Sequence, residues 1–232
     1  MRSVDRGALR ENEMEDSLRI IISDLIRNKA PTLFVKSRMV RDVHVSPPPL
    51  TLEARKQETI ARWTKDPDVR LETYPLIMVY RELQKQLGGD PQMLPAVESL
   101  LVRGILKHRF PTVNSVVDAA NLVSIKHLVP IGLFDLDKIT GDLELTLSAP
   151  GDQFIPIGKD KSVKLVPGTP VLKDADGIFS AVGSRDSKRT MITGATRNVL
   201  VFSWGIEGVE PALVSQVLDE CAMEIWNTRR ST

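Results

Sequence analysis

Residues 111–142 constrain the fold more than any other stretch of the chain. They read PTVNSVVDAANLVSIKHLVPIGLFDLDKITGD, with an Asn-Ser helix start at Asn114 and a break at Pro130-Ile131-Gly132. The start and the break predict a short helix with an apolar face between them. The acidic turn FDLDKITGD then leads into an alternating strand. A helix, a Pro-Gly break and several polar groups are therefore expected to lie close together, with the rest of the chain arranged around them.

Composition sets the outer limits. The chain has 232 residues, of which 42% are hydrophobic, and a net charge of +1, which fits a globular protein and argues against a wholesale polyanion binder. A local basic patch is compatible with this balance. Cys221 is the single cysteine and predicts no internal disulfide. The charged amino terminus lacks the apolar core of a signal peptide, and the longest apolar run, Pro75 to Tyr80, is too short to span a bilayer. We expect a cytoplasmic protein without membrane association.

The first part of the chain is predicted to be mainly helical. Residues 1–16 show no apolar periodicity, and we expect a disordered leader. Leu18–Ile26 fits a helical face or a buried strand, and its three central isoleucines favour the strand. Thr32–Val45 alternates loosely and stops at Ser46-Pro47-Pro48-Pro49, a connector that no helix can cross. Three helical patterns follow, at Leu52–Thr64, Pro75–Leu87 and Pro95–His108.

After the central stretch the pattern changes to strands and turns. Leu143–Leu147 alternates with period two, and Pro211–Trp226 spaces apolar side chains as one helical stripe. Further strands are expected at Phe154–Ile157, Val163–Val166, Pro170–Leu172, Ile178–Val182 and Val199–Ser203. This order predicts one α+β domain over residues 17–232. Its parts are a helical layer at about 50–128, a strand-rich part at about 133–205 and a C-terminal helix at about 211–226.

The sequence carries no motif for a metal, a phosphate loop or a serine nucleophile. It has no glycine-rich phosphate loop, no paired-cysteine zinc spacing, no His-Glu-x-x-His and no Gly-x-Ser-x-Gly. His44, His108 and His127 are scattered along the chain. Cys221 lies on the apolar stripe of the last predicted helix, where packing is its expected role. We therefore expect neither a metal nor a cofactor.

Two polar stretches are candidates for a functional site. The loop GSRDSKRT, residues 183–190, follows the predicted strand Ile178–Val182, and such a loop can offer basic groups to phosphate and hydroxyls to a ligand. The alternative is a solvated loop in which Asp186 pairs locally with Arg189. The other stretch, on and after the central helix, contains Asn121, Ser124, Lys126 and His127. The alternative for Asn121 is an amide that satisfies buried backbone groups.

Four blocks of sequence together resemble a known family. The run PTVNSVVDAANLVSIKHLVPIGLFDLDKITGDLEL is followed by GDQFIPIG, VPGTPVLKD and RDSKRTMITGATRNVLV. In this order and spacing they resemble the B3/B4 domain of the phenylalanyl-tRNA synthetase β subunit, and most closely its freestanding members. The resemblance covers roughly Tyr74–Glu207, with a weaker match at Leu18–Val45. It implies mixed or antiparallel sheets packed against helices in β/β/α layers.

The resemblance also implies a chemistry. In the synthetase this domain is an editing site that hydrolyses tyrosine wrongly esterified to tRNA, a second sieve that accepts the wrong product. Ester hydrolysis needs a positioned water and a stabilised oxyanion, and neither requires a metal. Asn121 matches the family's pocket asparagine, and Val129–Asp135 matches the bend that bacterial synthetases write as QPMHAFD. Gly132 replaces the histidine of that motif, and the acidic residue of the later loop falls near Asp186, so the sequence leaves the substrate open.

We therefore hypothesise a trans-acting aminoacyl-tRNA deacylase whose partner is aminoacylated tRNA. The sequence does not say whether it associates with a synthetase. The alternatives are a non-catalytic module that binds RNA or an amino-acid-like ligand in the same cleft, and a partner-binding domain that uses its C-terminal helix. The expected catalytic residues are Asp186, Ser187 and Thr190, and the expected substrate-binding residues are Asn121, Gly132, Phe134, Ser184, Arg185, Lys188 and Arg189.

Overall fold

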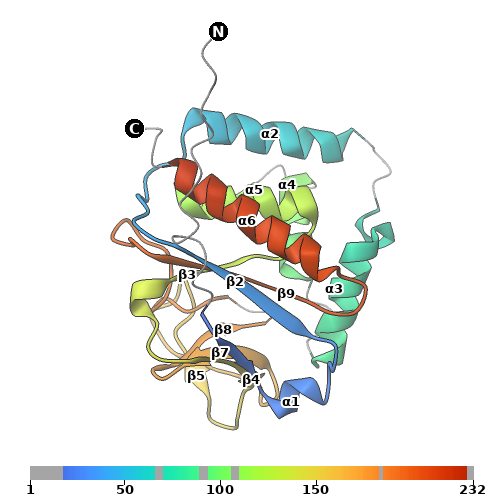
Figure 1. Cartoon of the computed structure of the whole chain (residues 1–232), viewed down its shortest axis with the longest axis vertical. Coiled ribbons are helices and arrows are strands. Elements are labelled where there is room, and N and C mark those ends of the chain that lie inside the picture. Colours follow the sequence, from blue (N-terminus) through green and yellow to red (C-terminus); the bar gives the residue numbers. More distant parts are fainter. Residues whose placement is uncertain (1–17, 66–69, 89–93, 106–109, 183–184, 229–232) are drawn as a thin grey trace.

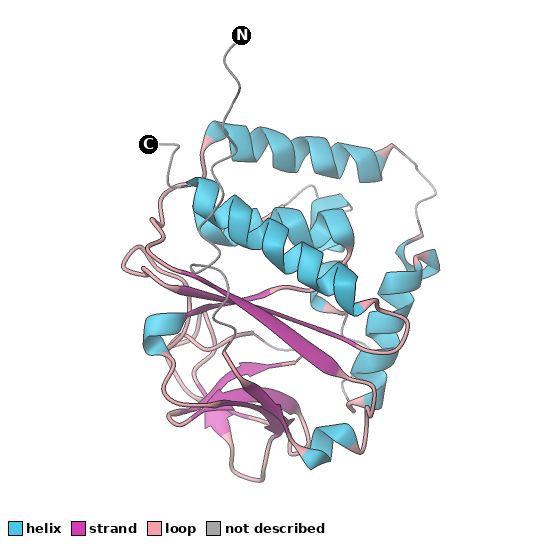
Figure 2. Cartoon of the chain, viewed as in Figure 1, coloured by secondary structure: helices cyan, strands magenta, loops and turns pink. Residues whose placement is uncertain are grey.

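A layer of helices covers a three-stranded sheet, and a four-stranded sheet lies on the other side of it (Figure 1). The computed structural model describes residues 18–65, 70–88, 94–105, 110–182 and 185–228. Figure 2 shows most of the long helices at one end of the molecule and most strands at the other. The helices are α1 (Asp24–Arg27), α2 (Leu50–Thr64), α3 (Pro75–Gln86), α4 (Ala96–Ile105), α5 (Ser115–His127) and α6 (Pro211–Asn227). The predicted α+β class with β/β/α layers is confirmed.

The strands form two main sheets and a separate hairpin. The three-stranded sheet has the order β2-β9-β3, with both pairings antiparallel. The other sheet has the order β1-β4-β7-β8, in which only β1 and β4 pair in parallel. β5 pairs with β6 alone. The strands are β1 (Ile20–Ile22), β2 (Phe34–Val40), β3 (Gly132–Asp135), β4 (Leu143–Leu147), β5 (Gln153–Phe154), β6 (Val163–Lys164), β7 (Pro170–Asp174), β8 (Gly177–Ala181) and β9 (Val199–Gly205).

The main core lies on both sides of the three-stranded sheet. Val199, Leu200 and Val201 of β9 are fully buried, as expected for a central strand that is covered on both faces. On one side, α6 packs against β2, β9 and α5. On the other side, the ring of Phe134 on β3 meets the ring of Phe179 on β8 edge to face, with centroids 4.9 Å apart. This aromatic pair joins the two sheets.

Most predicted elements are present in the structure, but the strands expected at Phe154–Ile157 and Val163–Val166 are reduced to the two-residue strands β5 and β6. Leu143–Leu147 is β4 with the predicted bounds, and the three helical patterns correspond to α2, α3 and α4, although His108 lies outside the described residues. The Pro-Gly break at residues 130–132 leads directly into β3, which sequence reasoning missed, because Gly132–Asp135 pair along β9. The strand expected over Leu18–Ile26 covers only Ile20–Ile22, since the Ser23 side chain caps the short helix α1.

The polar groups of the central stretch mostly hold α5 in place. The Asn114 side chain accepts hydrogen bonds from the backbone N–H groups of Val116 and Val117, which caps the helix. At the other end the Ser124 hydroxyl donates to the carbonyl of Val129 at 2.7 Å. Lys126 and His127 both contact Glu220 on α6, at 2.6 and 2.7 Å. These contacts give Ser124, Lys126 and His127 structural roles.

A buried lysine joins α2 to α5. The Lys56 side chain is fully buried, and its Nζ lies 2.7 Å from Asp118 Oδ2 and 2.6 Å from Glu53 Oε1. The hydroxyl of Thr112 supplies a further contact at 3.1 Å. A buried ammonium requires this number of partners, because one left without them would be strongly destabilising. Lys56 therefore fixes the position of α2 over α5.

Candidate active site

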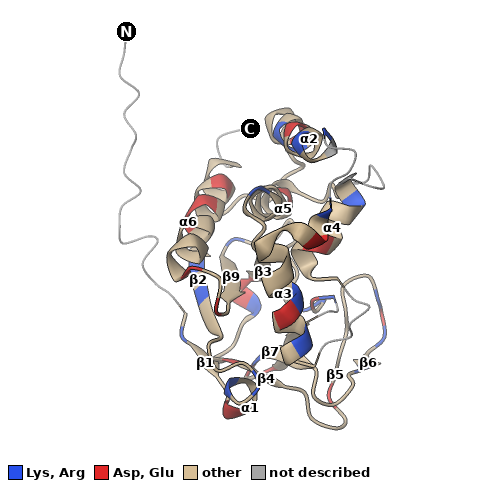
Figure 3. Ribbon diagram, turned by 90° about the vertical axis from the view of Figure 1, so that its right-hand side faces the viewer, with Lys and Arg blue, Asp and Glu red and all other residues tan. Residues whose placement is uncertain are grey.

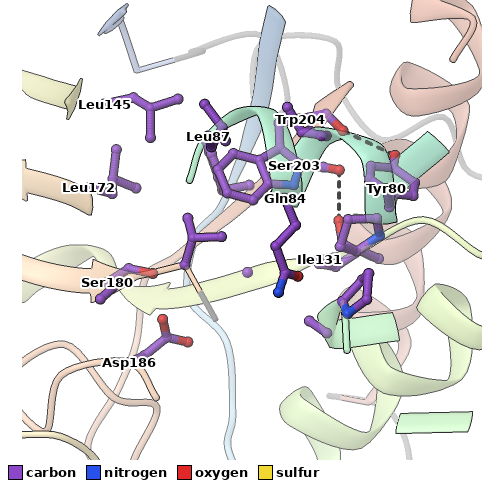
Figure 4. A pocket seen from close by; sticks show the side chains of 18 of the residues that line it. Tyr80, Gln84, Leu87, Ile131, Leu145, Leu172, Ser180, Asp186, Ser203 and Trp204 are labelled. Carbon is purple, nitrogen blue, oxygen red and sulfur yellow. Dashed lines mark hydrogen bonds between the residues drawn. The ribbon is translucent and has the colours of Figure 1, made fainter. Parts of the chain in front are cut away.

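A cavity of about 160 Å³ lies between the two main sheets, next to α3 (Figure 4). The three-stranded sheet contributes Gly132, Phe134 and Phe202 to its wall. Leu145 and Leu172 come from the other sheet, and α3 closes one side. The walls are mainly apolar, which is the usual character of a small-ligand site. The cavity is therefore a product of the β/β/α layering and involves distant parts of the chain.

Asp186 is the one charged side chain among the described residues that line the cavity. Burial raises the pKa of its carboxyl to about 6, although a hydrogen bond with the Ser180 side chain opposes the rise. In Figure 4 the carboxyl and the Ser180 hydroxyl lie on the same side of the cavity. A carboxylate with a pKa close to neutrality is suited to accept a proton from water at physiological pH.

Backbone hydrogen bonds hold Asp186 at this position. The N–H of Ser187 donates to the carbonyl of Phe179 on β8 at 2.8 Å. The N–H of Ile157 donates to the carbonyl of Asp186, also at 2.8 Å. The loop is thus bonded to β8 on one side and to the turn after β5 on the other. The carboxyl is positioned by main chain rather than by a flexible surface segment.

Neutral hydrogen-bonding groups from α3 and β9 complete the cavity. The Tyr80 hydroxyl donates to the carbonyl of Trp204 at 3.1 Å, and burial raises its pKa well above the ordinary value. The Ser203 hydroxyl donates to the carbonyl of Pro130 at 2.7 Å. Gln84 extends its side chain from α3 into the cavity, across from Ser180 and Asp186 in the view of Figure 4. The polar groups thus lie on two sides of an apolar space.

Three of the predicted site residues line this cavity: Gly132, Phe134 and Asp186. Gly132 stands against the Phe134 ring so closely that an added Cβ would lie 3.2 Å from Cε2 and Cζ. Ser187 and Thr190 are buried outside the cavity lining. The Ser187 hydroxyl accepts a hydrogen bond from the Arg189 N–H, and Thr190 Oγ1 has no partner among the described residues.

The predicted basic residues of the loop bind other parts of the protein. Arg189 forms a two-pronged ion pair with the buried Asp174, at 2.7 and 3.0 Å. Burial alone would raise the pKa of Asp174, but the hydrogen bonds from Arg189 and from the Thr140 N–H hold it below its ordinary value. Arg189 also donates to the carbonyl of Lys138, so its guanidinium is engaged in holding the loop. Arg185 donates to the carbonyl of Ile157, and Lys188 pairs with the exposed Asp160.

Asn121 and Ser184 complete the set of predicted residues. Asn121 lies on α5 and is absent from the cavity lining. Ser184 lies outside the described residues. Sequence reasoning missed Tyr80, Gln84, Ser180 and Ser203, because each lies in a regular element that was assigned to packing. The one signal available in the sequence was Gln84, a polar residue on the apolar face of the predicted helix Pro75–Leu87.

The described residues include neither a metal-binding cluster nor a membrane-spanning helix. No group of three or more His, Cys, Asp or Glu side chains in this part of the chain is arranged to hold a metal ion. No helix within the described ranges combines the length and the apolar character needed to cross a membrane. Cys221 is fully buried on α6, as predicted, and burial raises the pKa of its thiol.

The chain is similar to known proteins over this region. The β subunit of phenylalanine–tRNA ligase from Mycoplasma genitalium is 37% identical over 103 residues, which cover 44% of this chain and 12% of that subunit. The corresponding subunit from Corynebacterium jeikeium is 31% identical over 118 residues, covering 51% of this chain and 14% of the subunit. The chain thus spans only about an eighth of the length of these relatives.

A solved structure and a family model match as well. An N-terminal fragment of the phenylalanyl-tRNA synthetase β subunit from Pyrococcus horikoshii aligns with 90% of this chain and 48% of that one, with a TM-score of 0.46 and 14% identity. The model of the B3/4 domain matches residues 80–223, which is more than half of the chain and includes every described residue that lines the cavity. The chain belongs to the B3/4 domain family.

Proposed function

We propose that the protein is an editing-type hydrolase that removes amino acids from mischarged aminoacyl-tRNA. The observation that carries this proposal is the Asp186 carboxyl, with a pKa of about 6, at a mainly apolar cavity of about 160 Å³. An apolar cavity of about 150 Å³ is large enough for a benzene ring. The cavity thus suits one aromatic ring or a branched aliphatic side chain, while the ester bond lies near the carboxylate.

The reaction is the attack of water on the ester carbonyl. The ionised Asp186 accepts a proton from the water as its oxygen bonds to the carbonyl carbon. The tetrahedral intermediate then breaks the bond to the ribose oxygen, which leaves as an alcohol with the proton returned by Asp186. Ser180 acts as a positioning residue, because its hydroxyl bonds to the carboxyl and favours the ionised form. Gln84 reaches the same space and is the neutral group placed to meet the substrate.

The test is the release of amino acid from a panel of mischarged tRNAs, each compared with its rate in buffer. Asp186→Asn is expected to lower kcat by about 100-fold or more, the usual effect of losing a general base. Asp142→Asn removes an exposed carboxylate at the turn before β4 and serves as the matched control, with no expected effect. If no tRNA in the panel loses its amino acid faster than in buffer, the hydrolase proposal fails. Binding without turnover would instead indicate a non-catalytic module.

The pH dependence provides a second, sharper test. The rate constant kcat/KM should rise with pH and level off above about 6, because only the ionised Asp186 accepts the proton. The Ser180→Ala variant loses a hydrogen bond that lowers the pKa of Asp186, so its profile should move to higher pH. A profile that is the same in wild type and Ser180→Ala would contradict the assigned roles.

A further inference from the structure

The hairpin formed by β5 and β6 carries an exposed group of lysines. We call residues 153–164 the β5–β6 arm; its residues 157–164 are all exposed. Lys159, Lys161 and Lys164 lie in this run, and none of them pairs with a carboxylate of the described residues. In Figure 3, β5 and β6 lie at the edge of the molecule, away from the helices. The arm therefore presents free cationic groups to solvent.

The neighbouring loop adds to this charge. Arg185 is exposed, and its Nη1 donates to the carbonyl of Ile157. Lys188 is half-exposed and pairs with Asp160, the one carboxylate in the exposed run. With a net charge of only +1 for the whole chain, this excess of positive charge is local. A concentrated positive surface on a nearly neutral protein favours binding of a polyanion at that place.

The arm is bonded to the loop that carries the cavity carboxylate. Its backbone meets this loop through the Ile157 N–H and the Asp186 carbonyl, and through the Lys188 N–H and the Ile155 carbonyl, both at 2.8 Å. Pro156 and Ser187 form a β-bridge between them. Any ligand on the lysines of the arm thus lies beside the loop whose Asp186 side chain faces the cavity.

We propose that the β5–β6 arm binds the phosphates of a single-stranded RNA 3′ end and directs that end to the cavity. This inference rests on the proposed function for the identity of the polyanion. The exposed side chains of Ile157 and Val163 can contact ribose and base, but the arm has no exposed aromatic residue on which bases could stack. Its affinity is therefore mainly electrostatic. A membrane surface fits less well, since the arm exposes no Trp, Phe or Leu side chain that could insert into a lipid interface, its Phe154 being buried.

The test measures binding of a fluorescent single-stranded RNA of about ten nucleotides ending in CCA, within the range of known single-strand site sizes. The triple variant Lys159→Gln/Lys161→Gln/Lys164→Gln removes the three free charges of the arm. The control variant Arg62→Gln/Lys65→Gln/Lys85→Gln removes the same charge from exposed positions on and beside α2 and α3. Three phosphate contacts predict a slope of about −2 for log K against log salt, or about 20-fold weaker binding at 200 mM than at 50 mM salt.

The arm variant should lose most of this salt dependence and bind more weakly than wild type, whereas the control should behave as wild type. Asp160→Asn should bind more tightly, because it removes a negative charge and frees Lys188. Equal loss in the arm and control variants would overturn the inference, as would lysine-dependent binding to phosphatidylserine vesicles without RNA binding. If the arm variant binds RNA as tightly as wild type and also deacylates tRNA, the inference about the arm fails and the proposed function stands. If the arm binds RNA but no tRNA is deacylated, the proposed function fails and the inference about the arm stands.

Discussion

Asp186→Asn should stabilise the folded protein at neutral pH while it removes activity. Burial moves the pKa of this carboxyl from the ordinary 3.8 to about 6. Each pKa unit corresponds to about 1.4 kcal/mol, so the ionised group costs about 3 kcal/mol in the folded state, and about 2 after solvent screening of this partly exposed residue. The folded state holds the proton more tightly than the unfolded chain. The contribution of Asp186 to the stability of wild type is therefore highest below pH 3.8 and declines as pH rises through about 6.

Urea denaturation at several pH values measures this difference. At pH 7 the Asp186→Asn variant should be more stable than wild type by about 2 to 3 kcal/mol, and at pH 5 by roughly half of that. Asp142→Asn changes the same group at an exposed position and should show neither effect. A gain in the free energy of unfolding that does not change with pH would refute the reasoning, as would a variant less stable than wild type. Either result would mean that burial does not destabilise the ionised carboxyl of Asp186.

Three further predictions concern two residues near the site and one in the core. Arg189→Ala leaves the carboxylate of Asp174 buried without its partner and should lower the free energy of unfolding by about 3 kcal/mol, measured in urea; a loss of RNA binding with unchanged stability would contradict this. Gly132→Ala places a Cβ against the Phe134 ring and should cost about 1 to 2 kcal/mol. It should also slow hydrolysis of bulky aminoacyl esters more than small ones. Cys221 should react with a thiol reagent only after unfolding, and reaction of the native protein would show that α6 opens.

The regular elements could largely be predicted from the sequence. Alternation identified β4, and the apolar stripe of Pro211–Trp226 identified α6, because each element buries one face against a layer. That stripe packs on α5 and the sheet, which leaves little apolar surface for the partner-binding role considered for the C-terminal helix. β3 escaped prediction because a four-residue strand after Pro130 is defined by its pairing with β9, a long-range contact that no local pattern reveals.

The candidate site could be predicted only in part. The loop after β8 was recognised from its polar composition, but the sequence could not say which side chains face inward. In the structure Asp186 faces the cavity, while Arg189 forms an ion pair with Asp174 and Lys188 forms one with Asp160. Each of these pairings joins segments that are separated along the chain. Tyr80 and Gln84 were missed for the same reason, since the wall they form exists only once α3 packs beside the sheets.

The way in which Asp186 is held allows the two proposals to be tested separately. The loop is tied to β8 and to the β5–β6 arm by backbone hydrogen bonds, which do not depend on the lysine side chains of the arm. Replacing Lys159, Lys161 and Lys164 should therefore leave the carboxyl in place, with its pKa of about 6 unchanged. The arm variant should then raise KM for an aminoacyl-tRNA and leave kcat and its pH profile as in wild type. Asp186→Asn should do the opposite, because it removes the base and keeps the phosphate-binding surface.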